Sequence, residues 1–249
     1  MEVTQAWYQN WEFWTALVAL LALVLSQLPP LHQLLRKPKL VLEAYSRLVL
    51  AQKVGNPNAQ LHLILGNEGG RAARVRRIEL QVTRDGTHAA VLRGENYLAD
   101  LDREGTRLLT TFTVGPDHEW AHTVNFIRDV TREEVKEYRD AELALKSSIF
   151  ELRRADPDTK ELIEASPATV APFAAMFERR FVWKPGEYQI TISVIAEPAS
   201  AGVSRRYRFT VFESESLELR QAADDLRFGD GVYWDSGKHA GVTFQLVEA

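Results

Sequence analysis

The sequence contains no cysteine in its 249 residues. This absence excludes disulfides, thiolate metal sites and cysteine nucleophiles, and it suits a reducing compartment. A marked excess of either charge is also missing, because 30 Lys and Arg residues stand against 34 Asp and Glu residues. Nucleic-acid binding requires a basic excess or a basic patch, so we expect no nucleic-acid partner. Hydrophobic content of 45% and charged content of 26% are typical of a folded protein.

The common catalytic signatures are absent as well. The chain has no G-x-S-x-G motif, no dinucleotide-binding glycine pattern and no kinase pattern. Residues 228–231 (Phe-Gly-Asp-Gly) and 235–237 (Asp-Ser-Gly) contain residue types found in calcium and phosphate loops, but neither segment has the ligand spacing of an EF-hand or a P-loop. We interpret both segments as surface turns, and the adjacent acids Asp224 and Asp225 as solvated. The preferred prediction is therefore a protein that is not an enzyme and has no cofactor.

One segment lacks charge altogether. Residues 14–25 include no charged residue, glycine or proline. As a helix, residues 11–31 would be about 31 Å long, which matches a hydrocarbon core of about 30 Å. A cleaved signal peptide would need a basic region before the apolar run, and a buried core helix would need a polar face. The segment has neither, so we predict a single transmembrane helix over residues 11–31, within an N-terminal segment of residues 1–35.

The residues on either side of this segment predict its orientation. Aromatic residues that favour the membrane interface gather at its start, at Trp7, Tyr8, Trp11 and Trp14. No base precedes the span, whereas Arg36, Lys37 and Lys39 follow it. By the positive-inside rule, we predict that the N-terminus lies outside the cell and that residues 36–249 form a cytoplasmic domain. The lipid bilayer would then be one partner of the protein.

Beyond this segment, apolar and polar residues alternate in short runs separated by turn residues. Residues 60–67 place leucine at every second position, and Asp85-Gly86 is a strong hairpin signal. Helical periodicity begins after Thr131, which is followed three residues later by Glu134 in a capping-box pattern. These patterns predict a mainly-β domain with a helical insertion over residues 131–178.

The strands predicted after residue 180 favour one particular kind of β fold. A Pro185-Gly186 turn leads into alternating residues 188–194, and residues 207–211 predict the next strand. This pair is similar to the closing strands of an immunoglobulin-like sandwich, a resemblance that covers residues 40–128 and 180–213. It implies an immunoglobulin-like β-sandwich. Because the resemblance is to an architecture, it carries no functional residues.

Residues 118–122 (His-Glu-Trp-Ala-His) match the H-E-x-x-H pattern. On a helix, His118 and His122 would share a face and bind zinc, with Glu119 as general base. Candidates for a third ligand are Glu134, Glu137 and Glu142. On a strand the two histidines would lie about 13 Å apart, too far to share one ion. The turn residues before the motif and the alternation after it favour a strand, so a membrane-anchored zinc hydrolase is the alternative function.

Two groups of basic residues are candidate binding surfaces. They are Arg74, Arg76 and Arg77, and Arg205, Arg206 and Arg208. On neighbouring strands the two groups would together face an acidic partner or anionic lipid. We predict a membrane-tethered, non-enzymatic binding or assembly module whose partner is another protein or a second copy of the chain. A further alternative places the domain outside the cell, as an adhesion or envelope-assembly domain.

Overall fold

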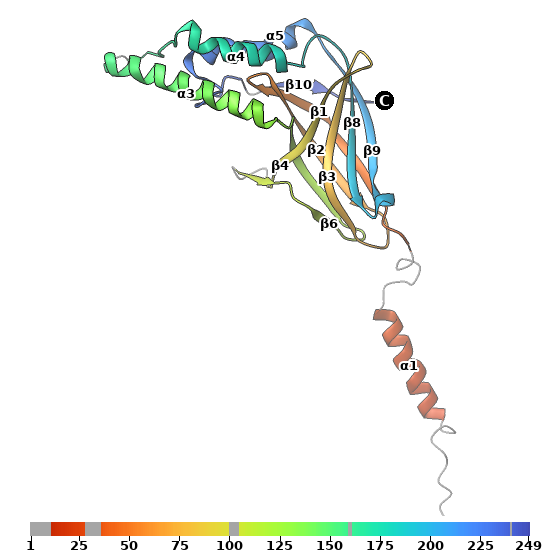
Figure 1. The fold of residues 1–249 in the computed structure, drawn as a ribbon. Helices are drawn as coiled ribbons and strands as arrows, with labels where there is room; N and C mark the ends of the chain where they lie inside the picture. Colours follow the sequence, from red (N-terminus) through yellow and green to blue (C-terminus); the bar gives the residue numbers. More distant parts are fainter. Residues whose placement is uncertain (1–10, 28–35, 100–104, 159–160, 240) are drawn as a thin grey trace, which may run out of the picture.

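A single antiparallel sheet forms the body of the domain, and helices pack over one of its ends (Figure 1). The computed structural model describes residues 11–27, 36–99, 105–158, 161–239 and 241–249. The strands are β1 (Leu40–Lys53), β2 (Asn56–Asn67), β3 (Ala73–Arg84), β4 (Thr87–Leu98), β5 (Thr106–Leu108), β6 (Phe112–Val114), β7 (Glu119–Ile127), β8 (Gly186–Glu197), β9 (Val203–Val211), β10 (Val242–Gln245) and β11 (Val247–Glu248). Their hydrogen-bonded order is β10-β1-β2-β7-β4-β3-β8-β9-β11, with β5 paired to β4 and β6 paired to β3.

The two edges of this sheet are joined by the C-terminal segment. β10 pairs with β1, and β11 pairs with β9. Only Leu246 separates β10 from β11, and its backbone N–H donates to the Ser46 carbonyl at 2.7 Å. Inside the sheet, the ring of Phe244 on β10 lies 5.4 Å from the ring of Phe209 on β9. The sheet is therefore nearly closed and barrel-like.

The predicted immunoglobulin-like sandwich is wrong. A sandwich consists of two sheets packed face to face, whereas the eleven strands of the described residues all belong to one sheet. β7 pairs with both β2 and β4, and the C-terminal segment connects β1 to β9. Alternation of apolar and polar residues predicts which strands have one buried face. It does not determine whether those faces belong to two sheets or to one curled sheet.

The core fills the inside of the curled sheet. β2 contributes Leu61, Leu63 and Leu65, all buried, while the residues between them are partly exposed. Near the helical end of the sheet lies Trp183, also buried, whose Nε1–H donates to the Ala51 carbonyl at 2.9 Å. This hydrogen bond ties the connection before β8 to β1.

A layer of helices covers the end of the sheet that includes the turn between β1 and β2 (Figure 1). They are α3 (Arg132–Ala155), α4 (Pro167–Arg180) and α5 (Glu213–Gln221). α3 lies within the helical insertion predicted for residues 131–178, and α4 begins within it and ends two residues beyond it. The capping box is present, because Thr131 Oγ1 accepts from the Glu134 N–H and the Glu134 carboxylate accepts from the Thr131 N–H. Buried Leu145 and Ile149 of α3 and Phe173 of α4 belong to a second apolar cluster.

The β1–β2 turn lies directly against α4. Gly55 in this turn has a φ of +76°, and a Cβ at this position would overlap the Phe177 carbonyl. A glycine is therefore required both for the backbone conformation and for the close approach of the turn to the helix.

The N-terminal helix α1 spans Trp11–Gln27. In the parts of the chain that the structure describes, none of the helices is both long enough and apolar enough to cross a membrane. The 17 residues of α1 correspond to about 25 Å, short of a hydrocarbon core of about 30 Å. The remaining predicted residues, 28–31, lie outside the described residues. The predicted transmembrane span is therefore wrong, and the single-pass membrane localisation and the orientation derived from it are corrected with it.

Candidate functional site

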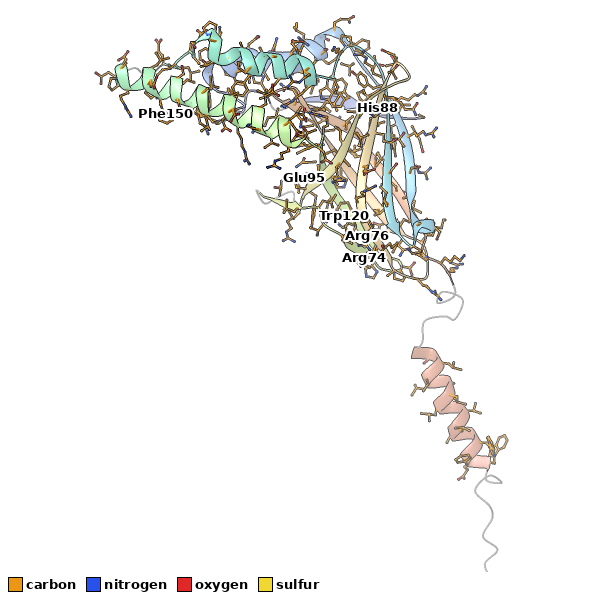
Figure 2. The ribbon with its side chains drawn as sticks, viewed as in Figure 1. Arg74, Arg76, His88, Glu95, Trp120 and Phe150 are labelled. Atoms are coloured by element: carbon orange, nitrogen blue, oxygen red, sulfur yellow. The ribbon has the colours of Figure 1, made fainter. Side chains whose placement is uncertain are left out.

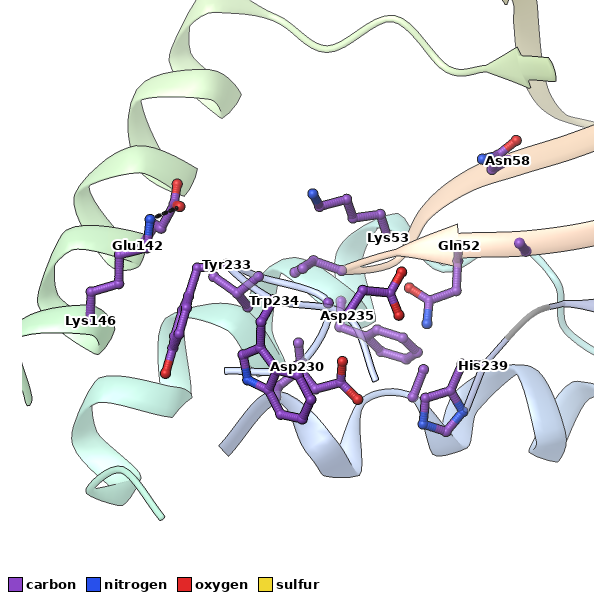
Figure 3. Close-up of a pocket in the computed structure, with 17 residues that line it drawn as sticks. Gln52, Lys53, Asn58, Glu142, Lys146, Asp230, Tyr233, Trp234, Asp235 and His239 are labelled. Carbon is purple, nitrogen blue, oxygen red and sulfur yellow. Dashed lines mark hydrogen bonds and ion pairs between the residues drawn. The ribbon is translucent and has the colours of Figure 1, made fainter. Parts of the chain in front are cut away.

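A cleft of about 620 Å³ lies where the end of β1, helix α3 and residues 222–239 meet. Figure 3 shows Glu142 and Lys146 of α3 on one side of it, and Gln52 and Asn58 of the β1–β2 hairpin on the other. Lys53, Asp230, Tyr233, Trp234 and Asp235 lie between these two sides, and His239 lies on the same side as Gln52. The cleft is thus lined by charges of both signs and by aromatic rings.

The α3 side of the cleft carries an ion pair one helical turn apart. Lys146 Nζ donates to the Glu142 carboxylate at 2.6 Å, the favourable i, i+4 arrangement. The same ammonium lies 5.5 Å from the centre of the Tyr233 ring, within cation–π distance. Burial raises the pKa of Tyr233, although the charges of Arg153 and Lys146 act in the opposite direction. This side therefore presents a protonated phenol and an ion pair that is already neutralised.

The turn at residues 228–234 lies between the α3 side and the β1–β2 side of the cleft. Gly229 adopts a φ of +79°, and a Cβ at this position would overlap the Tyr233 ring. The Trp234 Nε1–H donates to the Phe228 carbonyl at 2.9 Å, and the Gly231 N–H donates to the Trp234 carbonyl at 2.9 Å. These contacts close the turn and hold the rings of Tyr233 and Trp234 at the cleft.

Asp230 places a buried carboxylate in this turn, only 5% exposed. Its two oxygens accept from Ser236, one from the backbone N–H at 2.9 Å and the other from the hydroxyl at 2.5 Å. Among the described residues, no Lys, Arg or His forms an ion pair with Asp230. Burial of a carboxylate without an ion-pair partner is unfavourable, and the two donors that contact Asp230 are both neutral.

Asp225 and His239 lie close to Asp230 in the folded chain. His239 Nε2 lies 3.1 Å from Asp225 Oδ2, and Lys238 Nζ lies 3.5 Å from the same oxygen. The hydrogen bond with His239 lowers the pKa of Asp225, and the neighbouring Lys238 adds to this effect against the cost of burial. One ligand atom from each of Asp225, Asp230 and His239 lies within 4.8 Å of the others. We refer to these three residues as the Asp-Asp-His cluster, and carboxylate oxygens and imidazole nitrogens are both metal ligands.

The H-E-x-x-H residues do not line this cleft. Residues 119–122 lie on β7, and His118 precedes the strand with its Nδ1 2.7 Å from the Pro116 carbonyl oxygen. The segment is therefore not helical, and the helical arrangement in which the two histidines would share one zinc ion is not formed. His122 instead contacts the rings of Tyr97 and Trp120, at 4.7 and 4.8 Å.

The carboxylates considered as third zinc ligands all lie on α3, and each is paired with a base. The pairs are Glu134 with Arg128 and Arg180, Glu137 with Arg179, and Glu142 with Lys146. Their positions are therefore accounted for by interactions within the helical layer.

The two arginine groups lie on strands that are not neighbours, because β8 separates β3 from β9. Three of the six arginines pair with acids: Arg76 with Glu197, Arg77 with Glu79, and Arg205 with Glu248. Figure 2 shows Arg74 and Arg76 toward the end of the sheet away from α3. Arg206 and Arg208 are exposed on β9. The groups thus do not form one surface on adjacent strands, and an acidic partner remains a prediction.

A membrane-interface role is predicted from the sequence for Trp7, Tyr8, Trp11, Trp14, Arg36, Lys37 and Lys39. Trp7 and Tyr8 lie outside the described residues. Trp11 and Trp14 are exposed on α1, and Lys39 pairs with Glu68 at 2.6 Å. The assignment depended on the transmembrane span, and it is withdrawn with that span.

The Asp-Asp-His cluster has only a partial signature in the sequence. Asp230 and Asp225 belong to segments that the sequence analysis interprets as surface turns and solvated acids. The burial of Asp230 corrects that interpretation for this residue. His239 has no recognisable motif around it, and only the fold brings it to an acid 14 residues earlier in the chain.

A scan against protein-family models and a search of curated proteins each return no match. Among solved structures, the chain is similar to a protein from Archaeoglobus fulgidus, with 9% identity and a TM-score of 0.29, over 70% of this chain and 96% of that one. It is also similar to the putative ApaA protein from Bordetella pertussis, with 10% identity and a TM-score of 0.28, over 71% and 95% of the two chains. A third similar structure is Spo0M, a sporulation control protein from Bacillus subtilis, with 12% identity and a TM-score of 0.27. That match covers 76% of this chain and 56% of Spo0M. Likenesses this weak carry no argument about function.

Proposed function

We propose that the protein is a non-enzymatic binding module that holds a small zwitterionic molecule of the amino-acid class in the cleft beside α3. The observation that carries the proposal is the pair of opposite charges, Lys53 and Asp235, that line the cleft. Neither forms an ion pair with another described residue, whereas Lys146 is neutralised by Glu142. A ligand with one charge of each sign would complement both.

The size and the lining of the cleft support a small organic ligand. Its volume of about 620 Å³ falls within the range of roughly 300–1,000 Å³ that is common for small-molecule sites. Tyr233 and Trp234, both partly exposed, add aromatic surface to the lining. A planar side chain of the ligand would pack on these rings, while its ammonium and carboxylate groups pair with Asp235 and Lys53.

The proposal predicts that binding depends on both charges of the ligand. The twenty free amino acids would be titrated into the protein by calorimetry, and each one that binds would be compared with its methyl ester and its N-acetyl derivative. The ester lacks the carboxylate and the N-acetyl derivative lacks the ammonium group. We expect each derivative to bind at least about tenfold more weakly than the free amino acid.

Two substitutions assign the charges to residues. Lys53→Ala should remove the discrimination against the ester, and Asp235→Asn should remove the discrimination against the N-acetyl derivative. Lys136→Ala is the matched control, because Lys136 is exposed on α3 and does not line the cleft. If none of the free amino acids binds the wild-type protein, or if the derivatives bind as tightly, the proposal is wrong.

A protein partner or a second copy of the chain remains a separate prediction. Leu143 and Phe150 of α3 are 66% and 68% exposed, and they are the described apolar side chains of that helix most available to a partner. Light scattering of the purified protein would reveal self-association, and Phe150→Ser would reduce it if this face of α3 is the contact.

A further inference from the structure

We infer that the Asp-Asp-His cluster binds a divalent transition-metal ion. Asp225 and Asp230 would each supply a carboxylate oxygen, and His239 would supply a ring nitrogen. These ligand atoms lie within 4.8 Å of one another, although Asp225 belongs to the short helix η3 (Asp224–Phe228) and His239 to the segment before β10. Two carboxylates with one imidazole suit Zn²⁺ and Mn²⁺. The inference goes beyond the proposed small-molecule function and does not depend on it.

The burial of Asp230 is an independent reason to expect a cation here. The carboxylate is buried, and the donors that contact it are the N–H and hydroxyl of Ser236, which are neutral. No described base forms an ion pair with it. Burial of a carboxylate among neutral donors alone is unfavourable, and a metal ion at the adjacent ligand atoms would offset this cost.

Ser236 also fixes the orientation of Asp230. Metal-ligating carboxylates are commonly held by hydrogen bonds from residues behind them, which set their direction. Here Ser236 contacts both carboxylate oxygens, and each oxygen keeps a further lone pair for a metal ion. The turn itself is closed by hydrogen bonds, so Asp230 is held in place before any ion binds.

Lys238 is the group that competes with a metal ion. Its ammonium lies 3.5 Å from Asp225 Oδ2, and its side chain is 59% exposed. An exposed lysine pair contributes little to stability, so the ammonium can move into solvent when an ion binds. His239 Nε2, now 3.1 Å from the same oxygen, would turn from the carboxylate to the metal ion.

A metal ion at this place would remain accessible from the cleft. Asp230 and His239 line the cleft. Three protein ligands leave at least one coordination position of Zn²⁺ for a water molecule or another ligand. The chemistry of the site is therefore that of an open metal site rather than a closed structural one.

Metal binding is tested directly on the full chain after removal of any affinity tag and treatment with a chelator. Zn²⁺ and Mn²⁺ would be titrated separately by calorimetry, and bound metal would be measured by elemental analysis after desalting. We expect one ion of at least one of these metals per chain. His239→Ala and Asp230→Asn should each weaken binding at least about tenfold, whereas His88→Ala and Asp224→Asn should leave it unchanged. The controls match by residue type, because His88 and Asp224 are exposed and lie outside the cluster.

His239→Ala is the decisive variant, because His239 is exposed and its loss should not disturb folding. Circular dichroism of each variant would confirm that the sheet is intact. The inference is overturned if neither metal binds the wild-type protein at about one ion per chain, or if folded His239→Ala binds as tightly as wild type. Loss of binding in His118→Ala or His122→Ala, but not in His239→Ala, would also overturn it and would point to the β7 residues.

Discussion

Asn67, at the end of β2, uses the full hydrogen-bonding capacity of a buried amide. It is 2% exposed. Its NH₂ group donates to the carbonyls of Arg71 and Val114 at 2.9 and 3.0 Å. Its oxygen accepts from the backbone N–H groups of Lys39 and Gly69 at 3.2 and 3.0 Å. One side chain thus joins the start of β1, the turn after β2 and the end of β6.

Replacement of Asn67 should therefore destabilise the fold. Asn67→Ala leaves buried backbone groups without partners, and we expect the free energy of unfolding to fall by about 2–4 kcal/mol. Asn67→Asp keeps the two accepted hydrogen bonds and loses the two donated ones, so its effect should be intermediate. Urea unfolding measures both, with Gln81→Ala on the exposed face of β3 as a control that should change stability by less than about 0.5 kcal/mol. Equal stability of Asn67→Ala and the control would contradict this account.

Glu134 is a second residue whose contacts connect separate elements. Its carboxylate accepts from Arg128 at 2.7 Å and from buried Arg180 at 3.2 Å, as well as from the Thr131 N–H. Burial alone would raise the pKa of this carboxyl group. The hydrogen bonds from Arg128 and Thr131 and the charges of the two arginines outweigh burial, so the pKa of Glu134 is lowered.

A lowered pKa predicts how stability changes with pH. The contribution of Glu134 is fully present above the pKa of the unfolded chain, and it is lost as the pH falls through the lower pKa of the folded state. We expect the unfolding free energy of the wild type to fall more steeply below about pH 4.5 than that of Glu134→Gln. Urea unfolding at a series of pH values measures this difference. Glu137→Gln, which removes an exposed pair with Arg179, is the control and should keep the wild-type slope.

Among the elements, the C-terminal segment has the largest effect on the architecture. β10 and β11 contain only six residues in total, yet they pair with the two strands that would otherwise be the open edges of the sheet. Open strand edges are sites of unwanted pairing between chains. The packing of Phe244 on Phe209 places part of the core across this junction.

This junction predicts a large effect from one side chain. Phe244→Ala removes a buried ring between β10 and β9, and we expect a loss of about 3–5 kcal/mol in unfolding free energy. Thr243→Ala, at the exposed neighbouring position of β10, should have little effect. Thermal and urea unfolding of the two variants provide the comparison. If Phe244→Ala is as stable as Thr243→Ala, the C-terminal segment does not contribute to the core as described.

For the whole molecule, the sequence predicts the strands better than their arrangement. Alternation along residues 60–67 and 188–194 reflects the buried face of β2 and β8, because both strands have one face inside the sheet. The pairing of β7 between β2 and β4 has no comparable signal, since it joins strands that are distant in the chain. The same holds for the closure by β10 and β11. The length of the N-terminal helix, residues 11–27, was also not predictable, because the composition of an apolar segment does not determine the residue at which its helix ends.

The candidate site was harder to predict than the strands, because its residues come from separate elements that only the fold brings together. Lys53 comes from the end of a strand, Asp225 from a short helix, Asp230 from a turn, and His239 from the segment before β10. No spacing rule connects residues that converge only through loops. The burial of Asp230 depends on the turn that Gly229 permits, and a short Gly-Asp-Gly sequence occurs far more often in solvated turns.

The way the sheet closes also has a consequence for the order in which the protein is made. β1 is translated before the other described strands, whereas residues 242–245, which cover its outer edge, are translated after every other described strand except β11. The outer edge of β9 waits for residues 247–248 in the same way. The growing chain therefore carries exposed strand edges during most of its synthesis, and contacts between such distant segments form slowly. Nascent chains that stall before residue 242 should consequently be the most dependent on chaperones and the most prone to aggregate.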